Sequence, residues 1–133
     1  NNLTGPIPPF IGYFTYLITL YLFQNQLSGS IPPSICYLTN LTTLFLYKNP
    51  LSGSIPRDIG KMTSLEYLEL SENNLNGPIP HSIGNLTSLK ALILFGNRLS
   101  GSLPRSIINC TNLTRVRLEN NQLTGRISNF PCV

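Results

Sequence analysis

Charged side chains are scarce in this chain. Asp, Glu, Lys and Arg make up 11% of its 133 residues, and the net charge of +4 comes from nine scattered Lys and Arg. A nucleic-acid-binding surface needs basic residues in a patch or stripe, and the sequence contains no such run. The hydrophobic share of 41% is high enough for a packed core rather than a disordered tail. We therefore expect one folded domain over residues 1–133 that binds no nucleic acid.

Residues that carry catalysis or bind metals are also few. The one histidine, His81, has no acidic partner at a suggestive spacing, and no phosphate-binding glycine loop, kinase signature or metal-ligand cluster occurs. We expect Glu66, Glu69 and Glu72 to point to solvent from one open strand, away from any cleft that shifts a carboxyl pKa. These residues predict no enzyme activity, no metal and no cofactor.

A repeat of 24 residues runs through nearly the whole chain. The skeleton LxxLxLxxNxLxGxIPxxIGxLTx returns in each copy, and its asparagine falls at Asn1, Asn25, Asn49, Asn73, Asn97 and Asn121. A fixed period of this length is typical of stacked repeats, and LxxLxLxxN indicates the leucine-rich repeat. We predict an α/β repeat solenoid, mostly strand and coil: a right-handed superhelix with a parallel β-ribbon on its concave side and 3₁₀ or irregular turns on its convex side.

Alternation around each strand predicts which side chains face inward. One inner row is Leu20, Leu44, Leu68, Leu92 and Val116, and the next is Leu22, Leu46, Leu70, Leu94 and Leu118. Each coil buries its apolar face only against its neighbours. The asparagines are expected to satisfy backbone groups of their own turn and of the adjacent one.

The three cysteines cannot all pair within the chain. Cys36 and Cys110 lie about three coils apart, roughly 14 Å at the usual strand spacing, which is too far for a disulfide. We expect Cys110 to be a buried apolar side chain, whereas Cys36 stands where other copies have glycine.

Neither end of the repeat pattern has the features expected of a terminal repeat. The chain opens within a repeat, and after Ile127 the pattern fails because Ser128 and Pro131 replace the Pro104 and Ile107 of the preceding copy. Terminal repeats of solenoids normally differ from internal ones and cover the core. We expect about five and a half repeats without caps, part of a longer protein. The chain shows no signal peptide and no stretch of ~18 apolar residues that could span a membrane.

The LxGxIPxxIGxL segment resembles the plant-specific class of leucine-rich repeats, from Asn1 to about Ile127. That class is typical of the ectodomains of plant receptor-like kinases. The resemblance implies an extracellular, peptide-perceiving segment on the outer side of the plasma membrane, with a possible leucine-rich repeat co-receptor. A membrane span and a Ser/Thr kinase would lie outside these residues. Two alternatives stay open: a secreted inhibitor of polygalacturonase type, and a truncated fragment that binds nothing.

The outward side of the strand ribbon is the candidate binding surface, because partners of curved solenoids usually bind there. Aromatic and apolar side chains form a band that the core does not need, and such bands mark interaction surfaces. Cross-strand stacking that only stabilises the ribbon is the alternative. The candidate ligand-binding residues are Tyr21, Phe23, Phe45, Tyr47, Tyr67, Glu69, Ile93, Phe95, Arg115 and Arg117.

Arg115 and Arg117 point the same way from one strand and present two guanidinium groups, which suit a carboxylate. The stretch CTNLTRVRLENNQLTG is similar to the paired-arginine motif with which some peptide-sensing plant receptor kinases hold a ligand's free C-terminus. The alternative is two solvated arginines, paired with Glu119 or with nothing.

Five N-x-S/T motifs permit N-glycosylation if the chain is secreted and the sites are exposed. We expect at least two to be used, with Asn40 and Asn85 best placed and the last two competing with each other. The acceptor residues are Asn2, Asn40, Asn85, Asn109 and Asn112.

Overall fold

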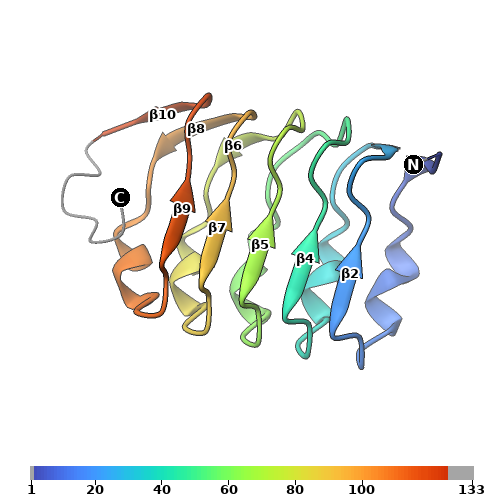
Figure 1. Ribbon diagram of the computed structural model, residues 1–133, viewed down its shortest axis with the longest axis horizontal. Helices are drawn as coiled ribbons and strands as arrows, with labels where there is room; N and C mark the ends of the chain where they lie inside the picture. The colour runs from blue at the N-terminus through green and yellow to red at the C-terminus, as the bar shows by residue number, and fades with distance from the viewer. Residues whose placement is uncertain (1, 126–133) are drawn as a thin grey trace.

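The computed structural model describes residues 2–125, which form a stack of coils with the strands of successive coils side by side (Figure 1). The main sheet has the order β2-β4-β5-β7-β9, and all its pairs are parallel. Leu20, Leu44, Leu68, Leu92 and Val116 are paired across it, so the predicted ribbon and its inner row are confirmed. Its strands are β2 (Thr19–Tyr21), β4 (Thr43–Phe45), β5 (Tyr67–Glu69), β7 (Ala91–Ile93) and β9 (Arg115–Arg117).

Short 3₁₀-helices cover the other side of the stack, as the turn-rich IPxxIGxL segments predict. Four of the five described helices begin directly after a proline in the extended conformation. The fixed φ of proline fits the residue before the first helical turn, and no hydrogen bond there needs its missing N–H. The i→i+3 hydrogen bonds are regular, for example from Ile11 N to Pro8 O at 3.0 Å. The helices are η1 (Pro9–Tyr13), η2 (Pro33–Tyr37), η3 (Ile59–Lys61), η4 (His81–Asn85) and η5 (Arg105–Asn109).

The core lies between the sheet and these helices. Leu44, Leu68 and Leu92 are at most 1% exposed, whereas Leu20 and Val116, on the outermost strands of the ribbon, are only partly buried. This difference is the expected consequence of a fold in which one coil buries the next. Each fully buried leucine contributes roughly 1.5–3 kcal/mol.

The asparagine row satisfies the backbone at the turn out of each strand. Asn73 Oδ1 accepts from Leu51 N at 3.1 Å, and its Nδ2 lies 3.0 Å from Leu70 O and 3.1 Å from Leu46 O. Leu46 and Leu51 belong to the preceding coil, so one amide serves two coils, as expected. Asn49 and Asn97 make the same set of bonds.

A second strand in most coils was not expected, because the sequence suggests only a bend at LxGxIP. Gln26, Asn74 and Arg98 each donate their N–H to a carbonyl of the preceding coil. Pro50 occupies the same place in its coil and has no N–H, so pairing there is reduced to isolated bridges and the layer splits in two. The two sheets are β1 (Thr4–Pro6) with β3 (Gln26–Ser28), and β6 (Asn76–Pro78) with β8 (Arg98–Ser102) and β10 (Gln122–Thr124).

Cys36 disturbs the packing of the 3₁₀-helices. At Gly60 and Gly84 an added Cβ would lie 2.3 and 2.5 Å from a carbonyl oxygen of the next coil, so these positions require glycine. Cys36 takes the equivalent position, and the helix of the following coil, η3, has three residues instead of five. Cys36 and Cys110 are free and buried, and burial raises the pKa of the Cys36 thiol to about 11. Cys132, Ser128 and Pro131 lie outside the described residues.

Candidate ligand-binding surface

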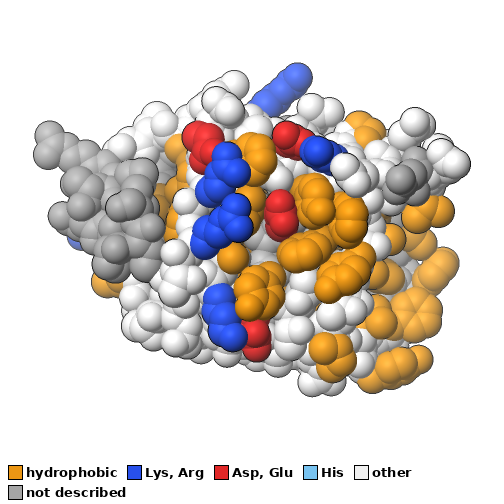
Figure 2. All heavy atoms as spheres, viewed as in Figure 1, with side chains coloured by type: hydrophobic (Ala, Val, Ile, Leu, Met, Phe, Trp, Pro, Cys, Tyr) orange, Lys and Arg blue, Asp and Glu red, His pale blue; other side chains and the backbone are white. Residues whose placement is uncertain are grey.

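The outward side of the five-stranded sheet, here called the ribbon face, divides into two halves. Figure 2 shows hydrophobic side chains gathered on one half and a column of Lys and Arg on the other. Two rows follow from the strand register: Thr19, Thr43, Tyr67, Ala91 and Arg115, and then Tyr21, Phe45, Glu69, Ile93 and Arg117.

The aromatic half lies over β2 and β4. Tyr21 stacks on Phe45 with ring centroids 5.2 Å apart, and Phe23 stacks on Tyr47 at 4.7 Å. The two stacks touch edge to face, with Phe45 6.3 Å from Phe23 and 5.9 Å from Tyr47. We call these four residues the aromatic cluster. Tyr21 is 57% exposed, so the cluster presents ring surface to solvent as well as stabilising the sheet.

The predicted apolar band does not extend as one surface to Ile93, and that expectation was wrong. Ile93 is only 5% exposed, because the row places it between the longer side chains of Glu69 and Arg117. Phe95 is half-buried, and the Arg117 guanidinium lies 4.2 Å from its ring centroid. Tyr67 is exposed but contacts Lys90 instead of the aromatic cluster.

The charged half lies over β5, β7 and β9 and the turns that follow them. Lys90 pairs with Glu66 at 3.1 Å, and Lys48, in the turn after β4, lies 4.0 Å from Glu72. Arg117 Nε donates to Glu119 Oε2 at 2.8 Å, and this hydrogen bond holds the pKa of Glu119 below its usual value. The Arg117 side chain is therefore already paired, whereas the exposed side chain of Arg115 makes no hydrogen bond or ion pair within residues 2–125.

Glu69 departs from the expectation of an unshifted, solvated carboxylate. Burial raises its pKa, while Arg115 and a hydrogen bond with Ser71 oppose that shift. Ser71 is only 1% exposed and lies beneath the surface beside Glu69. Glu69 makes no ion pair among the described residues, so its partly desolvated carboxylate is open to an external donor.

A hollow of about 260 Å³ opens on the ribbon face where the two halves meet. Ala91 is the smallest side chain of its row and leaves this gap between Tyr67 and Arg115. Sequence reasoning missed Ala91, Lys90 and Thr114 as site residues, although an alanine in a row of larger side chains was a usable signal. The lining residues are Phe45, Tyr67, Leu68, Glu69, Lys90, Ala91, Ile93, Thr114 and Arg115.

Comparison with known proteins gives consistent matches over this architecture. Leucine-rich repeat family models match residues 53–99, and also 16–38 and 40–62. The ectodomain of the Arabidopsis receptor kinase SOBIR1 is 36% identical with a TM-score of 0.87, over 93% of this chain and 68% of that one. This chain belongs to the leucine-rich repeat family.

Two further solved structures resemble this leucine-rich repeat chain. The Arabidopsis receptor kinase HAESA, in complex with the peptide hormone IDA and the co-receptor SERK1, is 44% identical with a TM-score of 0.90 over 93% of this chain. A plant ice-binding protein is 39% identical with a TM-score of 0.87 over 94% of it. The chain spans 21% of the HAESA chain and 41% of the ice-binding protein. No curated protein matches it.

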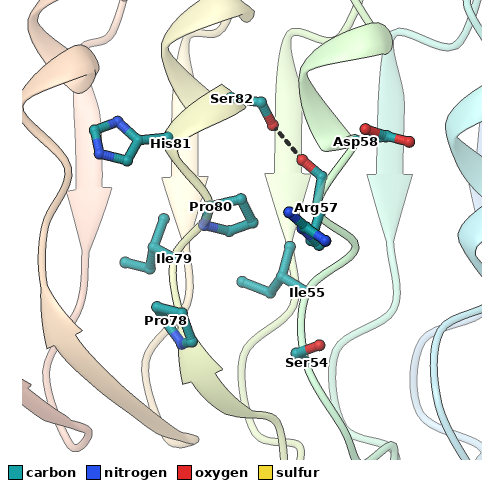
Figure 3. A pocket seen from close by; sticks show the side chains of 9 residues that line it. All are labelled: Ser54, Ile55, Arg57, Asp58, Pro78, Ile79, Pro80, His81 and Ser82. Atoms are coloured by element: carbon teal, nitrogen blue, oxygen red, sulfur yellow. Dashed lines mark hydrogen bonds between the residues drawn. The ribbon is translucent and has the colours of Figure 1, made fainter.

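Another hollow of this repeat array, of about 700 Å³, lies away from the ribbon face and is lined by Arg57, Asp58, His81 and Ser82 among others. Figure 3 shows His81 and Asp58 on opposite sides of it, pointing apart. Ser82 Oγ donates to Arg57 O at 2.7 Å and accepts from Gly60 N at 3.1 Å. Ser82 thus joins adjacent coils and is not positioned as a nucleophile.

All five sequon asparagines are exposed. Asn40 and Asn112 donate their side-chain amides to Thr15 O at 3.0 Å and Thr87 O at 2.9 Å. Asn85 and Asn109 end η4 and η5 and make no side-chain hydrogen bond within the described residues. Their amides are therefore not held by an internal hydrogen bond. Within residues 2–125 no helix is long and apolar enough to cross a membrane, and no cluster of metal-ligating side chains is found.

Proposed function

We propose that this chain is a peptide-binding segment of the extracellular part of a plant receptor-like kinase. An extended peptide lies across the ribbon face, with apolar residues on the aromatic cluster and its C-terminal carboxylate at Arg115. The observation that carries this proposal is the ribbon face itself, where partly exposed rings and an arginine whose side chain makes no hydrogen bond or ion pair among the described residues occupy one surface. HAESA, with its peptide hormone and SERK1, supports it and suggests a leucine-rich repeat co-receptor as second partner.

Arg115 is the better anchor of the arginine pair. Its guanidinium makes no hydrogen bond or ion pair among the described residues, whereas a carboxylate must compete with Glu119 for Arg117. Charge-assisted bonds to a carboxylate contribute about 1.5–3 kcal/mol each. We therefore expect Arg115→Ala to weaken binding of a free C-terminus more than Arg117→Ala does.

Selection from a random library of 12-residue peptides with free C-termini tests this function. Selected peptides should bind with at least tenfold lower affinity to Phe45→Ala and to Arg115→Ala/Arg117→Ala, and amidation should reduce the arginine effect. Arg57→Ala/Arg105→Ala is the matched control, because it deletes two exposed arginines away from the ribbon face. Binding that depends on the control pair, or no selected peptide at all, would contradict the proposal.

An extracellular receptor segment passes through the secretory pathway, so N-glycosylation of its exposed sequons is part of this proposal. The expected result after secretion from plant cells is glycan on Asn85 and on at least one other sequon, read by peptide mass spectrometry.

Pull-down with cell-wall polygalacturonases tests the alternative function as an inhibitor, because a peptide-binding face predicts that these enzymes are not captured.

A further inference from the structure

We propose that the hollow over Ala91 is a subsite for a tyrosine side chain of the bound peptide. This inference rests on the proposed function and specifies one of the residues that the ligand carries. Its basis is the shape of the hollow, the chemistry of its two walls and the polar groups at its rim.

The shape of the hollow suits one flat ring. Tyr67, Ala91 and Arg115 are register partners on three successive strands. Strands lie about 4.8 Å apart, so the outer two are about 10 Å apart, and the methyl group of Ala91 leaves the space above it open. A planar side chain entering there lies between the Tyr67 ring and the Arg115 guanidinium.

Both walls favour an aromatic occupant. Rings pair with rings, and guanidinium groups stack on aromatic faces. The same face already contains such a contact, since Arg117 lies 4.2 Å from the Phe95 ring centroid. A ligand ring over Ala91 would contact the Arg115 guanidinium as the Phe95 ring contacts that of Arg117.

The rim selects for a hydroxyl group on that ring. Glu69 offers a partly desolvated carboxylate that interacts with Arg115 and has a hydrogen bond with Ser71, and the Arg115 side chain beside it makes no hydrogen bond or ion pair among the described residues. The phenol hydroxyl of a ligand tyrosine can donate a hydrogen bond to the Glu69 carboxylate, and a phenylalanine cannot. A lysine side chain in the hollow would lie beside Lys90 and Arg115, and an acidic or phosphorylated side chain there would lie beside Glu69.

The peptides selected against the wild-type chain test the subsite. They should share a tyrosine at one position, and replacing it with phenylalanine should weaken binding about fivefold, the value of one net hydrogen bond. Glu69→Gln should reduce that discrimination. Ala91→Leu fills the hollow and should weaken binding at least tenfold. Ala91→Ser leaves the hollow open and should retain binding. Thr19→Leu introduces a leucine in the same row, three strands from Ala91, and should also retain binding.

The outcomes distinguish the tyrosine subsite from the proposed peptide-binding function on which it rests. Peptides that require Phe45 but carry tryptophan, lysine or no fixed residue over Ala91, or that tolerate Ala91→Leu, overturn the tyrosine subsite and leave peptide binding intact. Peptides that ignore every ribbon-face substitution overturn both. Melting curves of Ala91→Leu and Thr19→Leu are recorded first, and Tyr-to-Phe discrimination on the wild-type chain needs no variant to fold.

Discussion

The two halves of the ribbon face stand on the same scaffold but are held together by different forces. On the aromatic half, stacked rings bury apolar area against one another, and their free energy depends little on salt or pH. On the charged half, exposed ion pairs join neighbouring coils, and each contributes at most about 1 kcal/mol. The comparison teaches that a constant interior lets each coil change its exposed side chains without changing the fold.

The largest expected effect tests whether the interior is indeed the same under both halves. Asn49 lies beneath the aromatic half and Asn97 beneath the charged half, with matching hydrogen bonds and exposed fractions of 5% and 8%. Replacing either with alanine leaves one buried N–H and its carbonyls unpaired, which costs about 3 kcal/mol in the free energy of unfolding. Urea unfolding should give equal losses within about 0.5 kcal/mol, because the two asparagines have equivalent partners. Clearly unequal losses would mean that the surface side chains shape the interior.

The next effect separates the two kinds of surface. Phe45 contacts three other rings, so Phe45→Ala should lower the free energy of unfolding by about 2 kcal/mol, unchanged between 0.1 and 1 M NaCl. Tyr67→Ala is the control on the charged half. Tyr67 is 39% exposed and its ring has one cation contact, so its loss should stay below about 1 kcal/mol. Equal losses, or a salt-sensitive Phe45→Ala, would remove the distinction between the halves.

Features that recur in every coil were predictable from the sequence. The leucine rows, the asparagine bonds and the 3₁₀-helices follow from positions that the repeat holds constant, so each copy supports the assignment of the others. The second strand layer was not predicted. Its interruption was predictable, because Pro50 lacks the backbone N–H that Gln26, Asn74 and Arg98 donate at the equivalent position. The positive φ of Gln24, Lys48 and Glu72 was also missed, and Gly96 at the equivalent position was the signal for it.

Features of the candidate site depend on neighbours about 24 residues away, and the sequence within one coil does not reveal them. Ile93 alternates like an exposed residue, but its burial follows from the length of Glu69 and Arg117 on either side. The hollow requires the smallness of Ala91 together with the size of Tyr67 and Arg115. Both become visible only when the copies are aligned in columns and read across the strands.

A smaller effect concerns pH, where Glu69 and Glu119 act in opposite directions. The pKa of Glu69 is raised in the folded state, so the folded chain binds more protons and stability falls as pH rises from about 4.5, the ordinary glutamate value, through the folded pKa. Glu69→Gln should therefore raise the free energy of unfolding at pH 7 and leave it nearly unchanged at pH 4. The pKa of Glu119 is lowered, so its contribution is lost as pH falls through its folded pKa. A Glu69→Gln variant less stable than wild type at pH 7 would show that Arg115 outweighs burial.

The smallest effect compares one pair from each half directly. A double-mutant cycle on Lys90 and Glu66 should give a coupling of about 0.5 kcal/mol at low salt that vanishes in 1 M NaCl, because both side chains are substantially exposed and the Debye length falls to about 3 Å. The matching cycle on Tyr21 and Phe45 should give about 1 kcal/mol at both salt concentrations, since stacked rings carry no net charge to screen. If the ion-pair coupling survived high salt, the charged half would be a rigid part of the scaffold. Loss of the coupling in salt would show that Lys90, which lines the hollow, is held beside Glu66 by screened electrostatics alone.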